Sequence, residues 1–171
     1  MSIFSKWFNV SEKKENTVAA FATGTMCHLS ETPDKAFSSL AMGDGVAITP
    51  AHSSIVAPVA GKITMIFPTK HAFGIVTDEG IELLVHIGID TVNLKGKGFT
   101  YFKEMNTRVE AGEKIVDIDI DAIEKSGYNP IIMMIVVNQN GYKFVYEANG
   151  SVRKGKSMIA RYEKDTSGTG I

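Results

Sequence analysis

Two histidines stand where an imidazole could carry chemistry. His86 lies in the run Gly80-Ile-Glu-Leu-Leu-Val-His-Ile-Gly-Ile-Asp-Thr-Val92, whose other central residues are almost all Leu, Ile and Val. Burying a polar ring in such a strand costs about 1–3 kcal/mol unless the ring is hydrogen-bonded. Two interpretations account for it: a core histidine bonded to a neighbouring carbonyl, or a nucleophile at the mouth of an apolar depression.

Phosphoryl transfer is a reaction that suits a neutral imidazole. With a reference pKa near 6.5, about three quarters of such rings are neutral at pH 7, and one ring nitrogen is then unprotonated without a separate base. A bond from the other ring N–H to a backbone carbonyl would fix the tautomer and aim the free nitrogen outward. Gly88, two residues after His86, leaves room for a reacting group.

The second histidine is His71, in Pro68-Thr-Lys-His-Ala-Phe-Gly74. Taken alone, it reads as an exposed turn residue. Residues 71–77 and 81–87 are separated by a hairpin-length connection, and antiparallel pairing about residue 79 places positions 71–72 opposite 86–87. We therefore expect the two imidazoles to be cross-strand neighbours, where His71 could donate a hydrogen bond to a phosphate on His86.

These side chains require β structure to position them. Short runs rich in Val, Ile and Phe recur between turn signals and predict strands at 45–49, 54–59, 62–67, 72–77, 81–87, 114–120, 131–137 and 142–146. Strands of this length and spacing indicate an all-β, single-domain antiparallel sandwich or barrel-like fold. One or two short helices are expected: one over 121–124, ended by Gly127, and one from Pro33-Asp34 through residues 37–40.

Composition limits the class of protein. The 171 residues fit one domain, which we place at 17–163, between a flexible segment and linker at 1–16 and a flexible tail at 164–171. Net charge is −1 with the two signs interspersed, which argues against nucleic-acid binding. The single cysteine, Cys27, rules out an internal disulfide. With no signal-peptide pattern and no apolar run of about 20 residues, a cytoplasmic location is expected.

The run around His86 resembles the phosphorylation-site signature of the glucose-type IIA domain of the bacterial phosphoenolpyruvate-dependent sugar phosphotransferase system. The resemblance extends in consistent order from about Thr17 to Arg161. Further stretches similar to this family are Gly43-Asp-Gly-Val-Ala-Ile-x-Pro50, Val56-Ala-Pro-Val-x-Gly61, Thr69-x-His-Ala-Phe73, Leu94-x-Gly-x-Gly-Phe99 and Arg108-Val-x-x-Gly-x-x-Ile-Val116.

The resemblance implies a phosphoryl carrier with a phosphohistidine intermediate and no cofactor. His86 would accept phosphate from the phosphocarrier protein HPr and pass it to a cysteine of a sugar-specific IIB domain. His71 would support the phosphate, with the Thr69 hydroxyl orienting His71 and the Gly88 carbonyl orienting His86.

The same resemblance implies a shallow hydrophobic face around the histidines on which partners dock. Acidic residues beside the site would be Asp34 and Asp90. The apolar docking positions would be Phe37, Ala41, Met42, Phe73 and Leu84. Regulatory targets that bind this face are also expected.

Other titratable residues receive plainer interpretations. Cys27-His28 reads as a partly buried strand pair, and His52 as a turn residue. No metal site is predicted, because His71 and His86 supply two ligands where zinc sites use three or four protein ligands. A zinc ion bridging those two histidines to a partner is the one arrangement left open.

The first ten residues place Ile3, Phe4, Trp7 and Phe8 at helical spacing, with Lys6 on another face. Weak membrane contact through an amphipathic helix and packing on the domain both remain open for this segment.

Two other functions are compatible with parts of the sequence. A regulatory binding module would use the same apolar face without carrying phosphate. A biotinyl or lipoyl carrier is suggested by flanks such as Val56–Gly61 and 109–115, but its attachment-like triplet, Asp34-Lys-Ala36, precedes both flanks, and this order argues against it.

Overall fold

A computed structural model describes residues 16–168 of the chain. The strands in this range are β1 (Thr17–Ala19), β2 (Gly24–His28), β3 (Asp44–Pro50), β4 (Ser54–Val56), β5 (Gly61–Ile66), β6 (Ala72–Val76), β7 (Glu82–Ile87), β8 (Phe99–Tyr101), β9 (Arg108–Val109), β10 (Lys114–Ile118), β11 (Ile132–Asn138), β12 (Tyr142–Tyr146), β13 (Gly150–Val152) and β14 (Met158–Lys164). The helices are α2 (Lys35–Ser38) and α3 (Ile120–Lys125), with 3₁₀ turns at Leu29–Glu31 and Thr91–Leu94.

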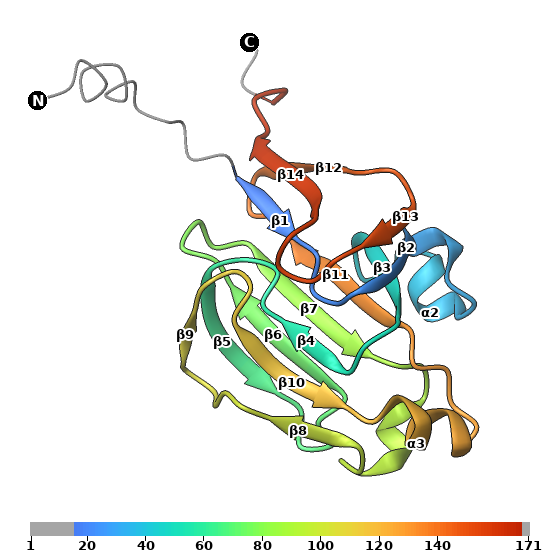
Figure 1. Cartoon of the computed structure of the whole chain (residues 1–171). Coiled ribbons are helices and arrows are strands. Elements are labelled where there is room, and N and C mark those ends of the chain that lie inside the picture. The colour runs from blue at the N-terminus through green and yellow to red at the C-terminus, as the bar shows by residue number, and fades with distance from the viewer. Residues whose placement is uncertain (1–15, 169–171) are drawn as a thin grey trace, which may run out of the picture.

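The strands form three antiparallel sheets. The large sheet has the order β13-β2-β3-β11-β7-β6-β5-β9, and the two three-stranded sheets have the orders β4-β10-β8 and β1-β14-β12. Figure 1 shows β4 and β10 lying across β6 and β7, with α2 and α3 at the periphery. The prediction of an all-β antiparallel sandwich with two short helices is confirmed.

The main core lies between the large sheet and the two smaller ones. In β6 and β7 every second residue enters it, including Phe73, Ile75, Leu83 and Val85. Because side chains alternate across a strand, the intervening residues face the opposite side of the sheet. That side carries a smaller apolar cluster formed by Leu29, Phe37, Ala47, Ile131, Met133 and Ile135.

Strand β11 at the centre of the sheet is buried on both faces. Its even-numbered residues 132, 134 and 136 belong to the main core and its odd-numbered residues 133 and 135 to the smaller cluster. It pairs with β3 on one side and β7 on the other. This explains why its sequence is a continuous apolar run.

The strands expected from sequence are all present, some of them shorter than predicted. The strand predicted at 54–59 is β4, which ends at Val56. The Ala57 amide still donates to the Glu113 carbonyl, but residues 57–59 are not part of a strand. The prediction missed β1, β2, β8, β9, β13 and β14. These are short or rich in Gly, Thr and charged residues, and they lack a sustained apolar pattern.

Both short helices have aspartate caps. The Asp34 side chain accepts from the Ala36 amide at the start of α2, and Asp119 accepts from the Ala122 amide at the start of α3. The second helix therefore begins one residue before the predicted start at Asp121. Gly127, at φ +86°, follows its end as expected.

The last strand extends past the predicted domain boundary at 163. Lys164 is still part of β14, where it pairs with Tyr142, and the Asp165 amide donates to the Gly141 carbonyl over 2.8 Å. The expectations for the first ten residues fall outside the described residues. No helix in residues 16–168 has both the length and the apolar character needed to cross a membrane.

Candidate active site

Strands β6 and β7 bring the two histidines together. Ala72 pairs with His86, and the Ile87 amide donates to the His71 carbonyl over 2.7 Å. The two imidazole centroids lie 5.0 Å apart with the rings at 76° to each other. The cross-strand arrangement expected from the hairpin spacing is therefore found.

The tautomer of His86 follows from its hydrogen bond. Its Nδ1 lies 2.9 Å from the Gly88 carbonyl oxygen. Since a carbonyl can only accept, Nδ1 carries the proton and donates it, which leaves Nε2 with a free lone pair in the neutral ring. The ring is partly exposed, so this nitrogen belongs to a side chain that reaches the surface.

The Gly88 position requires glycine. Its φ is +79°, and an added Cβ would lie 3.1 Å from the Asn129 carbonyl oxygen. A larger residue would be strained and would push the turn away from Asn129. The carbonyl that orients His86 thus depends on this residue type.

His71 is held more deeply than His86. Its side chain is 7% exposed, its Nδ1 lies 2.7 Å from the Thr69 hydroxyl, and its ring lies 5.2 Å from that of Phe67. The turn before it has Lys70 at φ +62°, and the Tyr101 hydroxyl donates to the Lys70 carbonyl over 2.9 Å. A fixed turn therefore sets where the second imidazole sits.

Burial keeps both rings neutral. The pKa of His86 is lowered from 6.5 to about 4, chiefly by burial and also by the neighbouring His71, while the Gly88 carbonyl, Asp34 and Asp90 act in the opposite direction. Burial also lowers the pKa of His71. At pH 7 the His86 ring is therefore neutral and its Nε2 is available as a nucleophile.

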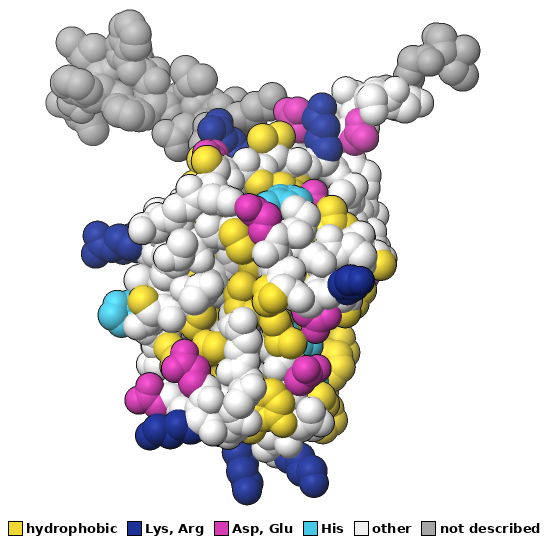
Figure 2. All heavy atoms as spheres, turned by 90° about the vertical axis from the view of Figure 1, so that its right-hand side faces the viewer, with side chains coloured by type: hydrophobic (Ala, Val, Ile, Leu, Met, Phe, Trp, Pro, Cys, Tyr) yellow, Lys and Arg dark blue, Asp and Glu magenta, His cyan; other side chains and the backbone are white. Residues whose placement is uncertain are grey.

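The helix α2 forms one wall of the site. The Phe37 ring lies 4.8 Å from the His86 ring and is 6% exposed, so this side chain contributes chiefly by desolvating the histidine. Ala41 and Met42 follow the helix and are exposed, Met42 by 42%. Figure 2 looks onto this side of the molecule and shows hydrophobic side chains gathered along its middle, with acidic side chains beside them.

The expectation that Phe73 belongs to the docking face is wrong. Phe73 is fully buried in the main core and packs edge-to-face on Tyr101. It is adjacent to Ala72, which pairs with His86, and consecutive strand residues point to opposite faces of the sheet. Leu84, two residues before His86, is on the expected face and packs against the smaller cluster.

Met65 is a member of this face that the sequence analysis missed. It pairs with Gly74, which pairs with Leu84, so the three lie in one row across β5, β6 and β7. Met65 is 42% exposed. A register shift between Ile63 and Met65 puts it on this face, and such an irregularity leaves no simple alternation to detect.

The two acidic residues flank the histidines at different depths. Asp34 is partly buried and caps α2, whereas Asp90 is exposed at φ +60° just before the Thr91–Leu94 turn. Both carboxylates act on the pKa of His86, which places negative charge beside the ring.

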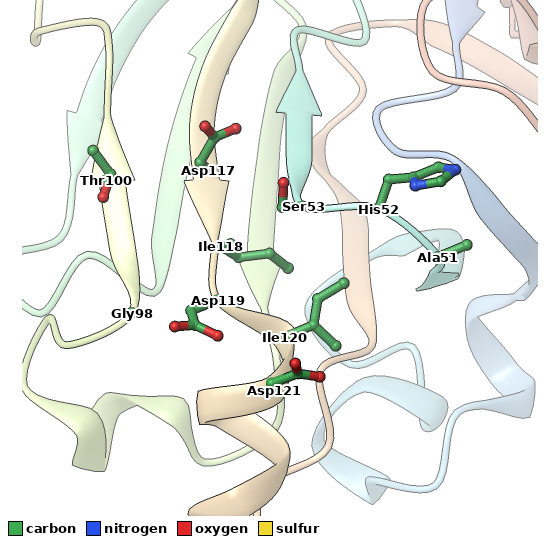
Figure 3. A pocket seen from close by; sticks show the side chains of 10 residues that line it. All are labelled: Ala51, His52, Ser53, Gly98, Thr100, Asp117, Ile118, Asp119, Ile120 and Asp121. Atoms are coloured by element: carbon green, nitrogen blue, oxygen red, sulfur yellow. The ribbon is translucent and has the colours of Figure 1, made fainter.

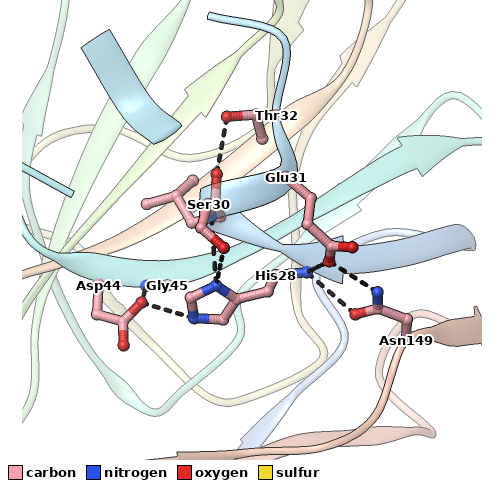
Figure 4. Close-up of polar contacts among 8 residues, drawn as sticks. His28, Ser30, Glu31, Thr32, Asp44, Gly45 and Asn149 are labelled. Carbon is pink, nitrogen blue, oxygen red and sulfur yellow. Dashed lines mark hydrogen bonds and ion pairs between the residues drawn. The ribbon is translucent and has the colours of Figure 1, made fainter. Parts of the chain in front are cut away.

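The other two histidines in residues 16–168, His28 and His52, lie apart from the paired imidazoles. His28 ends β2, where its Nδ1 lies 2.7 Å from the Ser30 hydroxyl and its Nε2 lies 2.8 Å from Asp44 (Figure 4). Its backbone amide is also bonded, to Glu31 and to Asn149, which ties β2 to the start of β13. These contacts cap the 3₁₀ turn at Leu29–Glu31.

His52 is an exposed bend residue, as expected, and lines an open pocket away from the paired histidines. Figure 3 shows His52 at the rim of this pocket, with Asp117, Asp119 and Asp121 along β10 and α3. Asp117 is paired with Lys114 and Asp119 caps α3, so these carboxylates have local partners. Within residues 16–168 no group of three or more His, Cys, Asp or Glu residues is placed to hold a metal ion.

Comparisons with known proteins find similar sequences and a similar structure. A family model described as "phosphoenolpyruvate-dependent sugar phosphotransferase system, EIIA 1" matches residues 16–142. The "PTS system glucose-specific EIIA component" of Buchnera aphidicola subsp. Acyrthosiphon pisum (strain APS) is 35% identical over 159 residues, which is 93% of this chain and 97% of that protein. Among solved structures, glucose permease IIA from Mycoplasma capricolum matches with a TM-score of 0.80 and 38% identity, covering 86% of this chain and 96% of that one.

Proposed function

Because this chain belongs to the EIIA 1 family of the phosphoenolpyruvate-dependent sugar phosphotransferase system, we propose that it carries the phosphoryl group on Nε2 of His86. Membership in the family makes it a phosphoryl carrier with HPr and a sugar-specific IIB protein as partners. The observation that supports His86 as the carrier is the bond from its Nδ1 to the Gly88 carbonyl, beside the second imidazole.

In the accepting step, the Nε2 lone pair of His86 attacks the phosphorus of phosphohistidine on HPr. The bond between phosphorus and the donor nitrogen breaks, and its electron pair returns to the donor ring. Nδ1 of His86 keeps its proton on the Gly88 carbonyl, so the positive character that develops in the ring is stabilised in place. The protein mainly positions the reactants and stabilises charge.

His71 supports the transferred group without bonding to it. We assign the Thr69 hydroxyl as a donor to Nδ1 of His71, which makes Nε2–H of His71 the free donor. A donor fixed 5.0 Å from the His86 ring, centre to centre, is placed to bind phosphate oxygens on that ring.

In the delivering step, a cysteine thiolate of the IIB domain attacks the same phosphorus. The Nε2–phosphorus bond breaks and its electrons return to His86 as a neutral ring. Burial is the main cause of the low pKa of His86, about 4, and it favours the neutral ring, which makes His86 a ready leaving group.

The docking surface combines an apolar patch with negative charge. Met42, Met65 and Leu84 supply the apolar part, and Asp34 and Asp90 the charge. Such a surface suits partners that present an apolar patch ringed by basic residues. We propose that HPr and IIB use this one face in turn, in the cytoplasm.

Phosphotransfer with purified components tests the proposal. The chain is incubated with phosphoenolpyruvate, enzyme I and HPr, and an acid-labile, base-stable label is expected on His86. A His86→Gln variant should take no label, while His71→Gln should accept phosphate but fail to deliver it to a glucose-type IIB domain, the first acceptor to try in view of the relatives' names. His52→Gln, a change at an exposed histidine elsewhere, is the matched control and should behave as wild type.

Three outcomes would count against the proposal. A wild-type chain that binds HPr but takes no label would be a regulatory binding module. Label that persists in His86→Gln would place the carrier elsewhere. Normal delivery by His71→Gln would remove the supporting role of the second imidazole.

A further inference from the structure

Thr91 is a fully buried polar side chain that the proposed reaction does not use. Its exposed fraction is 0%, and its hydroxyl donates to the carbonyl of Ile87. Ile87 is the last residue of β7 and stands between His86 and Gly88. The hydroxyl thus holds the backbone by a hydrogen bond at the point where the chain turns away from His86.

The Thr91 side chain also packs directly against Gly88. A Cβ built on Gly88 would lie 2.3 Å from the Thr91 methyl carbon and 3.1 Å from its hydroxyl oxygen. Contact this close leaves the Gly88 peptide no room to move toward Thr91.

Backbone bonds hold the same turn from the other side. The Gly88 amide donates to the Ile131 carbonyl over 2.8 Å, and the Ile89 amide donates to the Asn129 carbonyl over 2.9 Å. The segment from Ile87 to Ile89 is therefore clamped between the chain leading into β11 and the side chain of Thr91. A clamped turn has one orientation of its peptide planes, and so one direction for the Gly88 carbonyl.

We propose that Thr91 is a positioning residue for His86. By holding the turn at Ile87 and Gly88, its hydroxyl and methyl aim the Gly88 carbonyl at Nδ1 of His86 and so keep Nε2 as the unprotonated nitrogen. This inference rests on the proposed function for its consequence in catalysis, whereas its effect on the imidazole is independent of phosphate. Thr91 acts through Gly88 and takes no part in the bond changes.

Two substitutions test the hydroxyl and the methyl group of Thr91 separately. Thr91→Val keeps both γ branches and removes the donor, and Thr91→Ser keeps the donor and removes the methyl group. In nitrogen-15 spectra of the unphosphorylated proteins we expect a single His86 tautomer, with Nδ1 protonated, in wild type. Thr91→Val should show a mixture of tautomers and a lower pKa for His86, because the bond to Gly88 that favours the charged ring is weakened. Thr91→Ser should keep the wild-type tautomer.

We expect the rate of phosphate acceptance to depend on the tautomer of His86. Phosphate acceptance from HPr by Thr91→Val should fall by about tenfold or more in kcat, as expected when a reacting atom loses its fixed orientation. KM for HPr should stay unchanged because the docking face is intact, and Thr91→Ser should recover most of the rate. Should Thr91→Val fail to fold, Thr91→Ala read against Thr91→Ser gives the same comparison.

The outcomes distinguish this inference from the proposed function. A wild-type tautomer in folded Thr91→Val or Thr91→Ala overturns the positioning role, whether or not His86 carries phosphate. A changed tautomer in those variants together with no label on wild-type His86 would support the positioning role and contradict the proposed function.

Discussion

At the residue scale, the site depends on how two imidazoles are hydrogen-bonded and how deeply they lie. The carbonyl of Gly88 decides which nitrogen of His86 is free, and burial decides that the ring is neutral. His71 differs in both respects, because it is almost fully buried and its Nδ1 is bonded to the Thr69 hydroxyl instead of a backbone carbonyl. Two residues of one type are thus given different roles by their surroundings.

The depressed pKa of His86 predicts how stability depends on pH. Since the folded pKa is about 4 and the reference value 6.5, the unfolded chain binds more protons between these values, and stability falls as pH is lowered through this window. From pH 7 to pH 5 the free energy of unfolding should drop by about 2 kcal/mol from this group. Urea denaturation across this range tests it.

The variant His86→Gln is the control for this measurement, because it removes the titrating group. Its free energy of unfolding should change less over the same range, with the residual slope due in part to His71, whose pKa is also lowered. Equal slopes in wild type and variant would show that His86 is not buried in its neutral form.

The pairing of the two imidazoles could be predicted from the sequence, whereas the residues of the apolar face could be predicted less well. Hairpin spacing was enough to pair His71 with His86, since antiparallel register follows from a short turn. Phe73 was placed on the wrong face because its neighbour Ala72, one position away, is the one that shares a face with His86. Met65 was missed because a local register shift precedes it.

At the element scale, the short helix α2 links backbone capping to the charge near His86. Asp34 accepts from the Ala36 amide and also lies close enough to His86 to raise its pKa. The helix holds Phe37 against the His86 ring. Stability of this one turn therefore affects both the burial and the electrostatics of His86.

Two substitutions at Asp34 should separate these contributions. Asp34→Asn keeps a capping oxygen and removes the charge, so we expect little loss of stability and a further fall in the pKa of His86. Asp34→Ala removes the cap as well and should cost about 1 kcal/mol of stability. Urea denaturation and an imidazole titration by NMR measure the two effects. An unchanged His86 pKa in Asp34→Asn would contradict the electrostatic contribution.

The elements that could be predicted were those with a dense apolar pattern. Strands β7 and β11 are buried enough for their sequences to be nearly continuous apolar runs. Edge strands such as β9 and β13 contribute two or three residues each, too few for any period to be detected. Pairing with neighbours makes them strands, and single-sequence patterns do not report pairing.

At the scale of the whole molecule, the two faces of the large sheet carry different groups of residues. Its inner face and the two smaller sheets enclose the main core, while the outer face carries the histidines and the docking surface that we propose. A change on the outer face should therefore weaken partner binding without unfolding the protein.

Charged substitutions test this separation. Met42→Asp and Met65→Asp, both at positions that are 42% exposed, should raise KM for HPr with little change in stability, because apolar contact area is lost and a carboxylate would have to be desolvated in the apolar part of the interface. Val145→Asp, at a position 64% exposed on β12 in another sheet, is the control and should leave phosphotransfer unchanged. KM values equal to that of wild type in all three variants would mean that partners dock elsewhere.

We predict that Nε2 of His86 forms the bond to phosphorus while Nδ1 stays protonated on the Gly88 carbonyl. Nitrogen–phosphorus correlation spectra of the nitrogen-15 labelled chain, phosphorylated through HPr, examine that bond directly. We expect coupling of phosphorus to Nε2 of His86 and a retained proton on its Nδ1. Coupling to Nδ1 of His86, or to any atom of another residue, would contradict it.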